Sequence, residues 1–591
     1  MGRRLKIINS SKGFSLSLFI FLLFLVVSCT RVVETPKLTF GPVETKWVDK
    51  VLRKMTLEEK IGQMIALRYS GHFVNRDSDY FQRLESLIVE RKIGGLIIFG
   101  GEVYETAYLT NSFQKLAKVP LLIASDFERG VGNQIAGATL FPSLMGIGAT
   151  WSEEQAYLMG KITAWEGRAM GIHMTYAPVV DVNINPDNPI INTRSFGEDP
   201  AQVGRLAVAF IRGCQENGLI ATAKHFPGHG DTDQDSHSVL PTIKGDRDRL
   251  EKVELYPFKQ VIEAGVQAIM TAHLHIPAFD PTPDLPATLS PIILTELLRD
   301  ELGFNGIIVT DAMDMGGVIT LYEPEEAALK AVQAGVDIVL LPPEPDDVID
   351  SLIQAVREGE ISEERINTSV LRILKTKARL GLHREKLVNT KILDERVATK
   401  EYLQQADRVF ENSLTLVKNN GTVLPLSGED TKIAVFSLSS DPGGFYAGKT
   451  FLKEIEKRCP EMIPFYGGAY TGDEFIAEGW EKAKEADVLV FALFSSLRAW
   501  KGSVGLDLRH VRLIQEAAEN STPVVVVSFG SPYFLRHFPG IDSYICAYRW
   551  EAPAQRAAAK AIFGEIDVTG KLPISLPGLY PLGHGLALYK K

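Results

Sequence analysis

The sequence predicts an α/β protein in which a barrel of parallel strands is followed by a smaller α/β layered sandwich domain. The chain has 591 residues, which is too long for one hydrophobic core and suggests two to four domains. Between about residues 46 and 385, a short apolar run followed by a stretch of helical spacing recurs eight times. After about residue 400 a similar alternation resumes, beyond a charged stretch without clear periodicity.

The eight apolar runs of the first part predict eight buried strands. Strands buried on both faces read as continuous apolar runs, and their alternation with helices predicts parallel pairing through right-handed crossovers. Eight such units predict a TIM (β/α)8 barrel. The predicted strands are Ile61–Leu67, Gly94–Phe99, Leu121–Ser125, Ile172–Val180, Leu219–Ala223, Val266–Ala272, Gly306–Thr310 and Val336–Leu341.

Ionisable residues follow six of these runs. In a barrel of this kind the catalytic groups gather at the C-terminal ends of the strands, so we expect these side chains to face one site. Aspartate is also common as a helix cap or turn residue, so for Asp181 and His273 a structural role stays equally open. The full set is Arg68, Asp126, Glu128, Asp181, Lys224, His225, His273 and Asp311.

The segment KHFPGHGDTDQDSHS, residues 224–238, combines three histidines and three aspartates directly after the apolar, β-prone run GLIATA. Glycine permits backbone angles that other residues avoid. Gly228 and Gly230 therefore suit a tight or moving loop that carries ionisable side chains into a cleft. We interpret this loop as half of an active site.

Metal binding is the rival interpretation of the same loop. Asp231, Asp233 and Asp235 alternate as at the start of an EF-hand, but that loop needs Gly at its sixth position and Glu at its twelfth, where Ser236 and Thr242 stand. The first two histidines of the loop do not form a zincin pair, because the Pro-Gly between them breaks the helix that would align their rings. We therefore expect no metal.

The second part of the chain predicts a smaller α/β domain after the helical segment Val370–Leu380. We place the barrel domain at residues 46–385, a linker at 386–400 and the second domain at 401–591. The run PVVVVSFGSP lacks GxGxxG, so nucleotide binding has little support and no cofactor is expected. The predicted strands are Lys432–Leu438, Ala486–Leu493, Pro523–Phe529 and Ser543–Tyr548, and the predicted helices include Val511–Glu519 and Ala552–Phe563.

Residues 1–29 resemble a bacterial lipoprotein signal. Basic residues precede the apolar stretch Leu16–Val27, which is shorter than the roughly 20 apolar residues of a membrane-spanning helix and fits an exported signal. A small residue just before Cys29 is similar to a lipobox, so Cys29 is the predicted lipid anchor and residues 30–45 a linker. A plain secretory signal cleaved nearby is the alternative. In both cases we expect the mature protein outside the cytoplasm, at the periplasm or cell surface.

The overall charge and the number of cysteines argue against nucleic-acid binding, a disulfide framework and a zinc cluster. A formal net charge of -10 disfavours nucleic acid, because binding a polyanion relies on concentrated Lys and Arg. Besides Cys29, three widely spaced cysteines indicate neither a disulfide framework nor a zinc cluster. We expect membrane contact only through the lipid anchor, and no pattern predicts an oligomeric state.

Several ordered motifs resemble family 3 glycoside hydrolases, and the Asp-Ser-His triplet is similar to the bacterial β-N-acetylglucosaminidase branch of that family. The resemblance extends over nearly the whole mature chain and implies a barrel domain followed by an α/β sandwich domain. The motifs are ASDFERG at 124–130, NTRSFGEDP at 192–200, KHFPGHGDTDQDSH at 224–237, TDAMDM at 310–315 and TGKLPISLP at 569–577.

The resemblance implies catalytic roles for three residues. Asp311 would be the nucleophile of a retaining mechanism, since an ionised carboxylate can both stabilise and bond to an oxocarbenium-like carbon. Asp314 is the rival, but only Asp311 directly follows the predicted strand. His237 would be the proton donor, paired with Asp235, because the reference pKa of histidine lies near working pH and a carboxylate can orient its ring. An ordinary loop histidine is the alternative for His237.

The resemblance also implies that four residues hold the hydroxyl groups of the terminal sugar. Charged side chains make strong directional hydrogen bonds in a dry pocket. This sequence departs from the family pattern at Gln134, where relatives often have a second arginine, so contacts beyond the terminal sugar are open. We expect His229 to support the loop. The expected sugar-binding residues are Asp126, Arg194, Lys224 and His225.

Three functions agree with these observations. The first is an exo-acting β-N-acetylglucosaminidase, with cell-wall fragments (muropeptides) or chitin-derived oligosaccharides as substrates. The second is a β-glucosidase or a phosphorylase on the same fold, although Glu551 is a poor candidate for the glutamic acid that glucosidases of the family take from the second domain. The third is a non-catalytic sugar-binding surface lipoprotein.

Overall fold

The computed structural model describes residues 41–591 except 429–430, 442–443, 445 and 496–504. The described residues belong to one compact unit. The predicted signal segment and Cys29 lie outside the described residues, so the exported lipoprotein stays a prediction.

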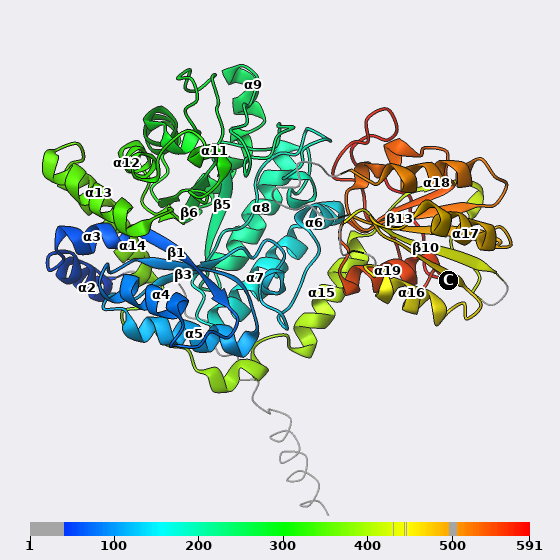
Figure 1. Cartoon of the computed structure of the whole chain (residues 1–591), viewed down its shortest axis with the longest axis horizontal. Helices are drawn as coiled ribbons and strands as arrows, with labels where there is room; N and C mark the ends of the chain where they lie inside the picture. Colours follow the sequence, from blue (N-terminus) through cyan, green and yellow to red (C-terminus); the bar gives the residue numbers. More distant parts are fainter. Residues whose placement is uncertain (1–40, 429–430, 442–443, 445, 496–504) are drawn as a thin grey trace, which may run out of the picture. The chain divides into compact units, whose positions relative to one another are not determined.

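Eight parallel strands form the first sheet, which curls into a barrel (Figure 1). Neighbours in the sheet follow chain order, and β8 pairs with β1. Backbone hydrogen bonds between residues 308–310 and 337–338 nearly close the ring, which confirms the predicted TIM barrel. The strands are β1 Ile65–Gly71, β2 Gly95–Gly101, β3 Leu122–Ser125, β4 Met174–Thr175, β5 Ile220–Phe226, β6 Ala268–Thr271, β7 Ile307–Val309 and β8 Val339–Leu340.

Helices surround the strands (Figure 1). Their ends follow local sequence signals: α13 starts at Pro345 with two aspartates in its first turn and stops at Gly359, whose φ is 83°. The helices of this part are α2 Pro42–Leu52, α3 Leu57–Gln63, α4 Asp79–Val89, α5 Val103–Leu116, α6 Leu144–Thr150, α7 Glu153–Ala169, α8 Pro200–Gln215, α9 Arg247–Lys252, α10 Leu255–Glu263, α11 Gly316–Ile319, α12 Pro324–Ala334, α13 Pro345–Glu358 and α14 Glu363–Arg379, with a π-helical segment at Ile292–Glu301.

The first predicted strand, Ile61–Leu67, began too early. A capping box between Thr56 and Glu59 starts α3, and this helix runs to Gln63 before β1 begins at Ile65. The apolar run therefore covers the buried end of a helix as well as a strand, and apolar composition does not separate the two.

Three polar residues expected after the strands lie within them. Arg68 belongs to β1, and Lys224 and His225 belong to β5. Lys224 and His225 can be buried in the strand because Lys224 bonds to Asp126 and His225 bonds to Asp181. β4 is shorter than predicted, although the run beyond it still lies beside β5, where Val180 donates to the carbonyl of Lys224.

The predicted linker 30–45 extended too far. Helix α2 begins at Pro42, because Gly41 stands at its N-cap and the side chain of Glu44 accepts the Gly41 N–H at 3.0 Å. At the other boundary, residues 386–398 lie against the barrel, with Asn111 bonded to both backbone groups of Val388. A short 3-10 helix, Thr390–Glu395, leads to α15.

The second domain is built on a six-stranded sheet with the strand order β11-β10-β12-β13-β14-β9, parallel except for β9. This confirms the predicted smaller α/β domain, but β9 and β11 were not among the predicted strands. Its elements are α15 Lys400–Ser413, β9 Thr415–Asn419, β10 Ile433–Ser439, α16 Lys449–Glu456, β11 Ile463–Gly467, α17 Asp473–Ala483, β12 Val488–Phe494, α18 Leu508–Ala518, β13 Val524–Ser528, β14 Ser543–Cys546 and α19 Ala552–Ile562.

Close backbone contacts join the second domain to the barrel. The carbonyl of Pro573 accepts the Glu198 N–H at 3.0 Å, and a Cβ on the neighbouring Gly197 would lie 2.3 Å from that carbonyl oxygen. The buried side chain of Asn183 donates to the Tyr533 hydroxyl at 3.1 Å. These contacts join the segments around Tyr533 and Pro573 of the second domain to the barrel.

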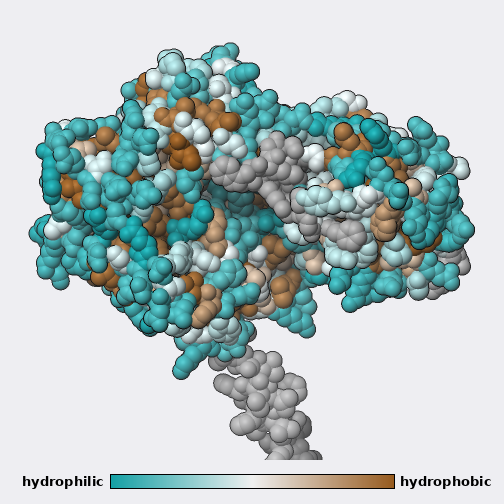
Figure 2. Space-filling view, in the orientation of Figure 1, coloured by the Kyte–Doolittle hydropathy of each residue, from teal (hydrophilic) through white to brown (hydrophobic). Residues whose placement is uncertain are grey.

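The core of the barrel and the two faces of the second sheet are separate clusters of buried apolar side chains. The face of the molecule in Figure 2 is mostly hydrophilic, with apolar residues in small separate patches. Within the described residues, no helix has both the length and the apolar character needed to span a bilayer.

Candidate active site

A cavity of about 500 Å³ opens at the C-terminal ends of the barrel strands. Each strand, or the segment directly after it, contributes to the lining. Asp235 is not part of the lining but contacts one of its residues. The predicted site residues that line the cavity are Asp126, Arg194, Lys224, His225, His237 and Asp311.

Two cations and two anions form an ion cluster in this cavity. Lys224 Nζ lies 2.7 Å from Asp126 and 2.8 Å from Glu128, and Arg194 donates two hydrogen bonds to Glu128 at 2.7 and 2.9 Å. Burial by itself raises the pKa of Glu128, but Arg194 and Lys224 hold that pKa well below its usual value. The cluster is balanced in charge and offers charged donors and acceptors to sugar hydroxyls.

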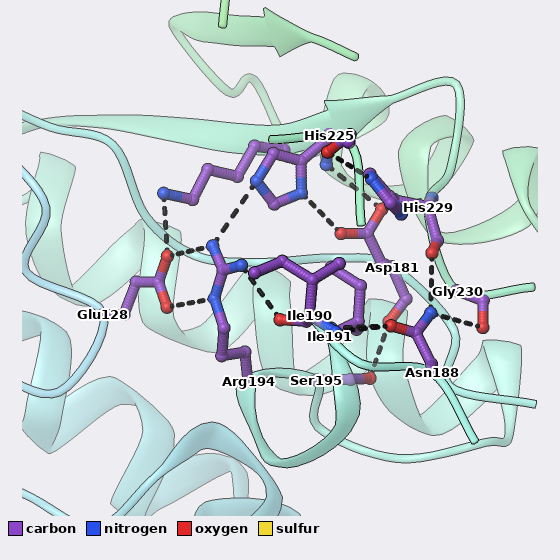
Figure 3. A network of polar contacts seen from close by, with 12 residues as sticks. Glu128, Asp181, Asn188, Ile190, Ile191, Arg194, Ser195, His225, His229 and Gly230 are labelled. Atoms are coloured by element: carbon purple, nitrogen blue, oxygen red, sulfur yellow. Dashed lines mark hydrogen bonds and ion pairs between the residues drawn. The ribbon is translucent and has the colours of Figure 1, made fainter. Parts of the chain in front are cut away.

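Asp181 fixes the orientation of His225 (Figure 3). Its Oδ2 lies 2.7 Å from His225 Nδ1, and its Oδ1 accepts the backbone N–H groups of His225 and His229 at 3.1 and 2.8 Å. With Nδ1 donating to Asp181, His225 directs Nε2 toward Arg194, 3.5 Å away. Asp181 is therefore a positioning residue rather than a helix cap.

The loop after β5 is tied down from two sides. Asn188 donates to the carbonyls of His229 and Gly230 at 3.0 and 3.1 Å, as Figure 3 shows. His229 Nε2 lies 2.9 Å from the hydroxyl of Ser236. Burial and the neighbouring His225 lower the pKa of His229 to about 4, so its ring is neutral at neutral pH. His229 thus supports the loop, as expected.

Asp311 follows β7 and faces the cavity, where its Oδ1 accepts the N–H of Ala312 at 2.8 Å. Burial opposes the charged form, yet the nearby His225, His273 and Lys224 bring the pKa of Asp311 below its usual value. The carboxylate is therefore ionised at neutral pH. Asp314 is about half exposed and lies 3.7 Å from Arg68.

His273 holds the backbone beside Asp311. The ring is buried, with Nδ1 2.9 Å from the Thr288 hydroxyl and Nε2 3.0 Å from the carbonyl of Ala312. A donor at Nε2 fixes the peptide between Ala312 and Met313, one residue after Asp311. His273 therefore supports the site without lining its cavity.

His237 and Asp235 form a hydrogen-bonded pair. Nδ1 of His237 lies 2.7 Å from Asp235 Oδ1, and the same oxygen accepts the His237 backbone N–H at 2.9 Å. The Asp235 side chain is almost completely buried, whereas the imidazole is about a quarter exposed and reaches the cavity. The buried carboxylate therefore orients an accessible ring.

The segments that carry Asp311 and His237 contact each other directly. The N–H of Gly316 donates to the carbonyl of His237 at 2.9 Å, and the N–H of Gly317 donates to the carbonyl of Ser236 at 3.1 Å. An added Cβ on Gly316 would lie 2.6 Å from the His237 oxygen. Only a residue without a side chain permits this approach, which brings the predicted nucleophile and proton donor to one cavity.

The second domain also reaches the cavity. Arg549, three residues after β14, lines it together with Arg129 of the barrel. Both arginines bond to Glu551, and their charges outweigh the effect of burial and lower the pKa of Glu551 to about 2. A carboxylate with this pKa is not a proton donor at neutral pH. This agrees with the prediction that Glu551 is a poor candidate for the acid that glucosidases of the family take from the second domain.

Among the described residues, no group of three or more His, Cys, Asp or Glu side chains is arranged to hold a metal ion. Asp231, the first aspartate of the EF-hand-like pattern, instead lies 2.7 Å from Arg249.

Comparison with known proteins identifies the family. The model described as "Glycosyl hydrolase family 3 N terminal domain" matches residues 56–376, and "Glycosyl hydrolase family 3 C-terminal domain" matches residues 414–580. A β-hexosaminidase A of Pseudoalteromonas piscicida is 32% identical over 552 residues, covering 83% of this chain and 91% of that protein.

The chain belongs to glycosyl hydrolase family 3.

Solved structures of similar proteins have the same architecture. A family 3 β-N-acetylglucosaminidase from Paenibacillus sp. is 32% identical with a TM-score of 0.78, covering 88% of this chain and 99% of that one. A β-glucoside phosphorylase is 27% identical with a TM-score of 0.82, covering 92% and 99%. These findings confirm the resemblance and show that the protein is a glycoside hydrolase by family.

Sequence patterns do not assign a role to three residues at or directly behind this family 3 cavity. Glu128 holds both of the cations that are predicted to bind sugar, and its place two residues after Asp126 at a strand end was a usable signal. Asp181 was noted but left open. Arg549 carried no signal in the sequence, because only the packing of the second domain brings it to the barrel mouth.

Proposed function

We propose that the protein is an exo-acting retaining glycoside hydrolase that releases terminal β-linked N-acetylglucosamine. The observation that carries this proposal is the placement of Asp311 and His237 on one cavity, with His237 hydrogen-bonded to Asp235. The relatives named as hexosaminidase and N-acetylglucosaminidase support the choice of sugar.

Asp311 is the proposed nucleophile. Its lowered pKa keeps it ionised, and its one described hydrogen-bond donor is the neighbouring backbone N–H of Ala312. The carboxylate attacks the anomeric carbon and forms a glycosyl-enzyme intermediate, while the bond to the leaving oxygen breaks.

His237 is the proposed acid and base. Asp235 accepts from Nδ1 and orients the ring, and we assign proton exchange with the substrate to Nε2. The imidazolium protonates the departing glycosidic oxygen in the first step, and the neutral ring takes a proton from water in the second. The Lys224–Arg194 ion cluster and His225 hold the terminal sugar.

Trapping of the intermediate tests the nucleophile. A slow fluorinated N-acetylglucosaminyl substrate is expected to label Asp311, located by fragmentation of the labelled peptide in a mass spectrometer. Asp311→Asn should lower kcat at least about a thousandfold, because the covalent route is lost. Asp314→Asn is the matched comparison on the same segment, and a label on Asp314 would refute the assignment.

Substrates with different leaving groups test whether His237 is the proton donor. His237→Ala should lower kcat/KM by about 10² to 10⁴ for substrates with a poor leaving group, where proton donation matters most. The loss should be much smaller for a 4-nitrophenyl glycoside, whose leaving oxygen needs little help. Equal losses on both substrates would contradict a role as acid.

Phosphorolysis is the second candidate function. The arginines at the cavity and the relative named as a phosphorylase favour it. A product analysis with and without inorganic phosphate distinguishes the two functions: hydrolysis gives the free sugar in both cases, whereas phosphorolysis gives a sugar 1-phosphate only with phosphate. Glucosides assayed beside N-acetylglucosaminides test the β-glucosidase alternative.

We also propose that the protein is exported and anchored through a lipid on Cys29. The support is the basic and apolar sequence before this cysteine. Wild-type protein should fractionate with membranes and Cys29→Ser should be found in the soluble fraction; equal fractionation of the two would exclude the anchor.

A further inference from the structure

The cations that line the cavity are not equally compensated. Lys224 and Arg194 face Asp126 and Glu128, so this cluster has two charges of each sign. Another lining arginine, Arg68, lies 3.7 Å from Asp314. The other two, Arg129 and Arg549, come from opposite domains and share a single acid, Glu551.

Arg129 and Arg549 meet at one carboxylate oxygen. Arg549 Nη2 lies 2.6 Å from Glu551 Oε1, and Arg129 Nη1 bonds to the same atom. Arg549 Nε also contacts both oxygens at 3.1 and 3.2 Å. Two cations against one anion leave this group with a surplus of one positive charge.

The two guanidinium groups retain donors for a ligand. Within the described part of the chain, Arg549 Nη1 and Arg129 Nε and Nη2 have no hydrogen-bond partner. Both side chains are less than one fifth exposed, and both line the cavity. A buried positive charge without a matching anion costs free energy of folding. An anion or a water molecule that accepts hydrogen bonds from the unused N–H groups lowers that cost.

We propose that Arg129 and Arg549 form an oxyanion subsite at the domain boundary, with Glu551 holding the two guanidinium groups in place. A planar guanidinium binds a carboxylate or phosphate through parallel N–H donors, and two converging groups suit one oxyanion. The proposal rests on the proposed glycosidase function and adds an anionic ligand to it.

The oxyanion has two possible sources. It is either a carboxylate carried by the leaving group of the substrate, or free inorganic phosphate that enters after the first step. In the second case a phosphate oxygen of HPO₄²⁻ bonds to the anomeric carbon, the bond to Asp311 breaks, and the carboxylate leaves with the electron pair. The charge balances without a further reactant.

The first arm of the experiment compares two aryl N-acetyl-β-glucosaminides, one with a para carboxylate and one neutral. The quantity measured is the ratio of the two kcat/KM values, which does not depend on the fraction of folded enzyme. Arg549→Met should lower this ratio about tenfold if the subsite binds the leaving group, the factor that corresponds to one charged hydrogen bond. Arg549→Lys should recover part of it, because the charge remains.

The second arm titrates inorganic phosphate with the neutral substrate and measures sugar 1-phosphate. If the subsite binds phosphate, Arg549→Met should raise the KM for phosphate about tenfold and leave the charged-to-neutral substrate ratio unchanged. The matched control is Arg536→Met, which removes another interdomain arginine, bonded to Asp187 and outside the cavity. It should change neither quantity.

The outcomes separate the two proposals. A shift in either quantity in Arg549→Met, absent in Arg536→Met, supports the subsite and identifies its ligand. No shift in either quantity, in an enzyme that turns over the neutral substrate, overturns the subsite alone. A wild-type protein without turnover of any N-acetylglucosaminide would instead overturn the proposed function.

Discussion

Glu254 is a buried carboxyl group next to the loop after β5. Its side chain packs where a Cβ on Gly228 would lie, at 2.6 Å, and its Oε1 is 2.9 Å from Arg249. Burial raises its pKa to about 7, with Arg249 opposing and Asp231 and Asp181 adding to the shift. This residue therefore ionises within the physiological range although it has no place in the proposed chemistry.

The raised pKa of Glu254 predicts a pH-dependent stability. The folded-state pKa lies above the unfolded value of 4.5, so folding favours the protonated form, and stability falls as pH rises from about 4.5 to 7. The loss amounts to roughly 3 kcal/mol. Glu254→Gln resembles the protonated form, so the variant should not lose this stability as pH rises.

Unfolding at pH 4.5 and pH 8 checks this prediction. The stability of Glu254→Gln relative to wild type should rise between the two pH values by up to about 3 kcal/mol. A relative stability that is the same at both would show that Glu254 does not titrate as expected.

At the scale of elements, the start of α11 holds the loop that carries His237. Gly316 and Gly317 donate to two consecutive carbonyls of that loop, and a methyl group on Gly316 would overlap one of them. The positions of the proposed nucleophile and the proposed acid are thus set by a contact between two loops and not by the strands alone.

Gly316→Ala tests this contact. The added methyl should push the loop away and lower kcat/KM about tenfold or more for poor leaving groups, since part of the acid catalysis is lost, with a smaller effect on a 4-nitrophenyl glycoside. Gly472→Ala is the matched control, because a Cβ there meets nothing within 4 Å. A loss of equal size on both substrates would indicate general damage and not displacement of His237.

At the scale of the whole molecule, the second domain completes the barrel mouth. The hydrogen bond from Asn183 to Tyr533 is buried and joins the two domains beside the cavity. Tyr533→Phe should destabilise the protein by about 1 to 3 kcal/mol, because the Asn183 amide loses its partner in a site without solvent.

Thermal unfolding of Tyr533→Phe measures this cost. Tyr580→Phe, at a partly buried tyrosine away from the cavity, is the control for loss of a hydroxyl and should change the midpoint far less. An unchanged midpoint in Tyr533→Phe would mean that the interdomain contact contributes little to stability.

Local patterns were sufficient for the architecture and for much of the site. Continuous apolar runs predicted the eight barrel strands, because burial on both faces excludes polar residues from most positions. The resemblance of the motif around Asp235 and His237 to the family implied their pairing, and the two side chains are hydrogen-bonded in the structure. The run Ile61–Leu67 failed because a helix end and a strand are equally apolar there.

The sequence by itself determined the barrel, the second domain and the chemical groups at the strand ends, all of which follow from local periodicity and residue type. Only the tertiary structure decided that Asp181 orients His225, that Gly316 docks the His237 loop and that Arg549 enters the cavity. These contacts join residues more than 40 positions apart, and in the last case two domains, so no local pattern encodes them.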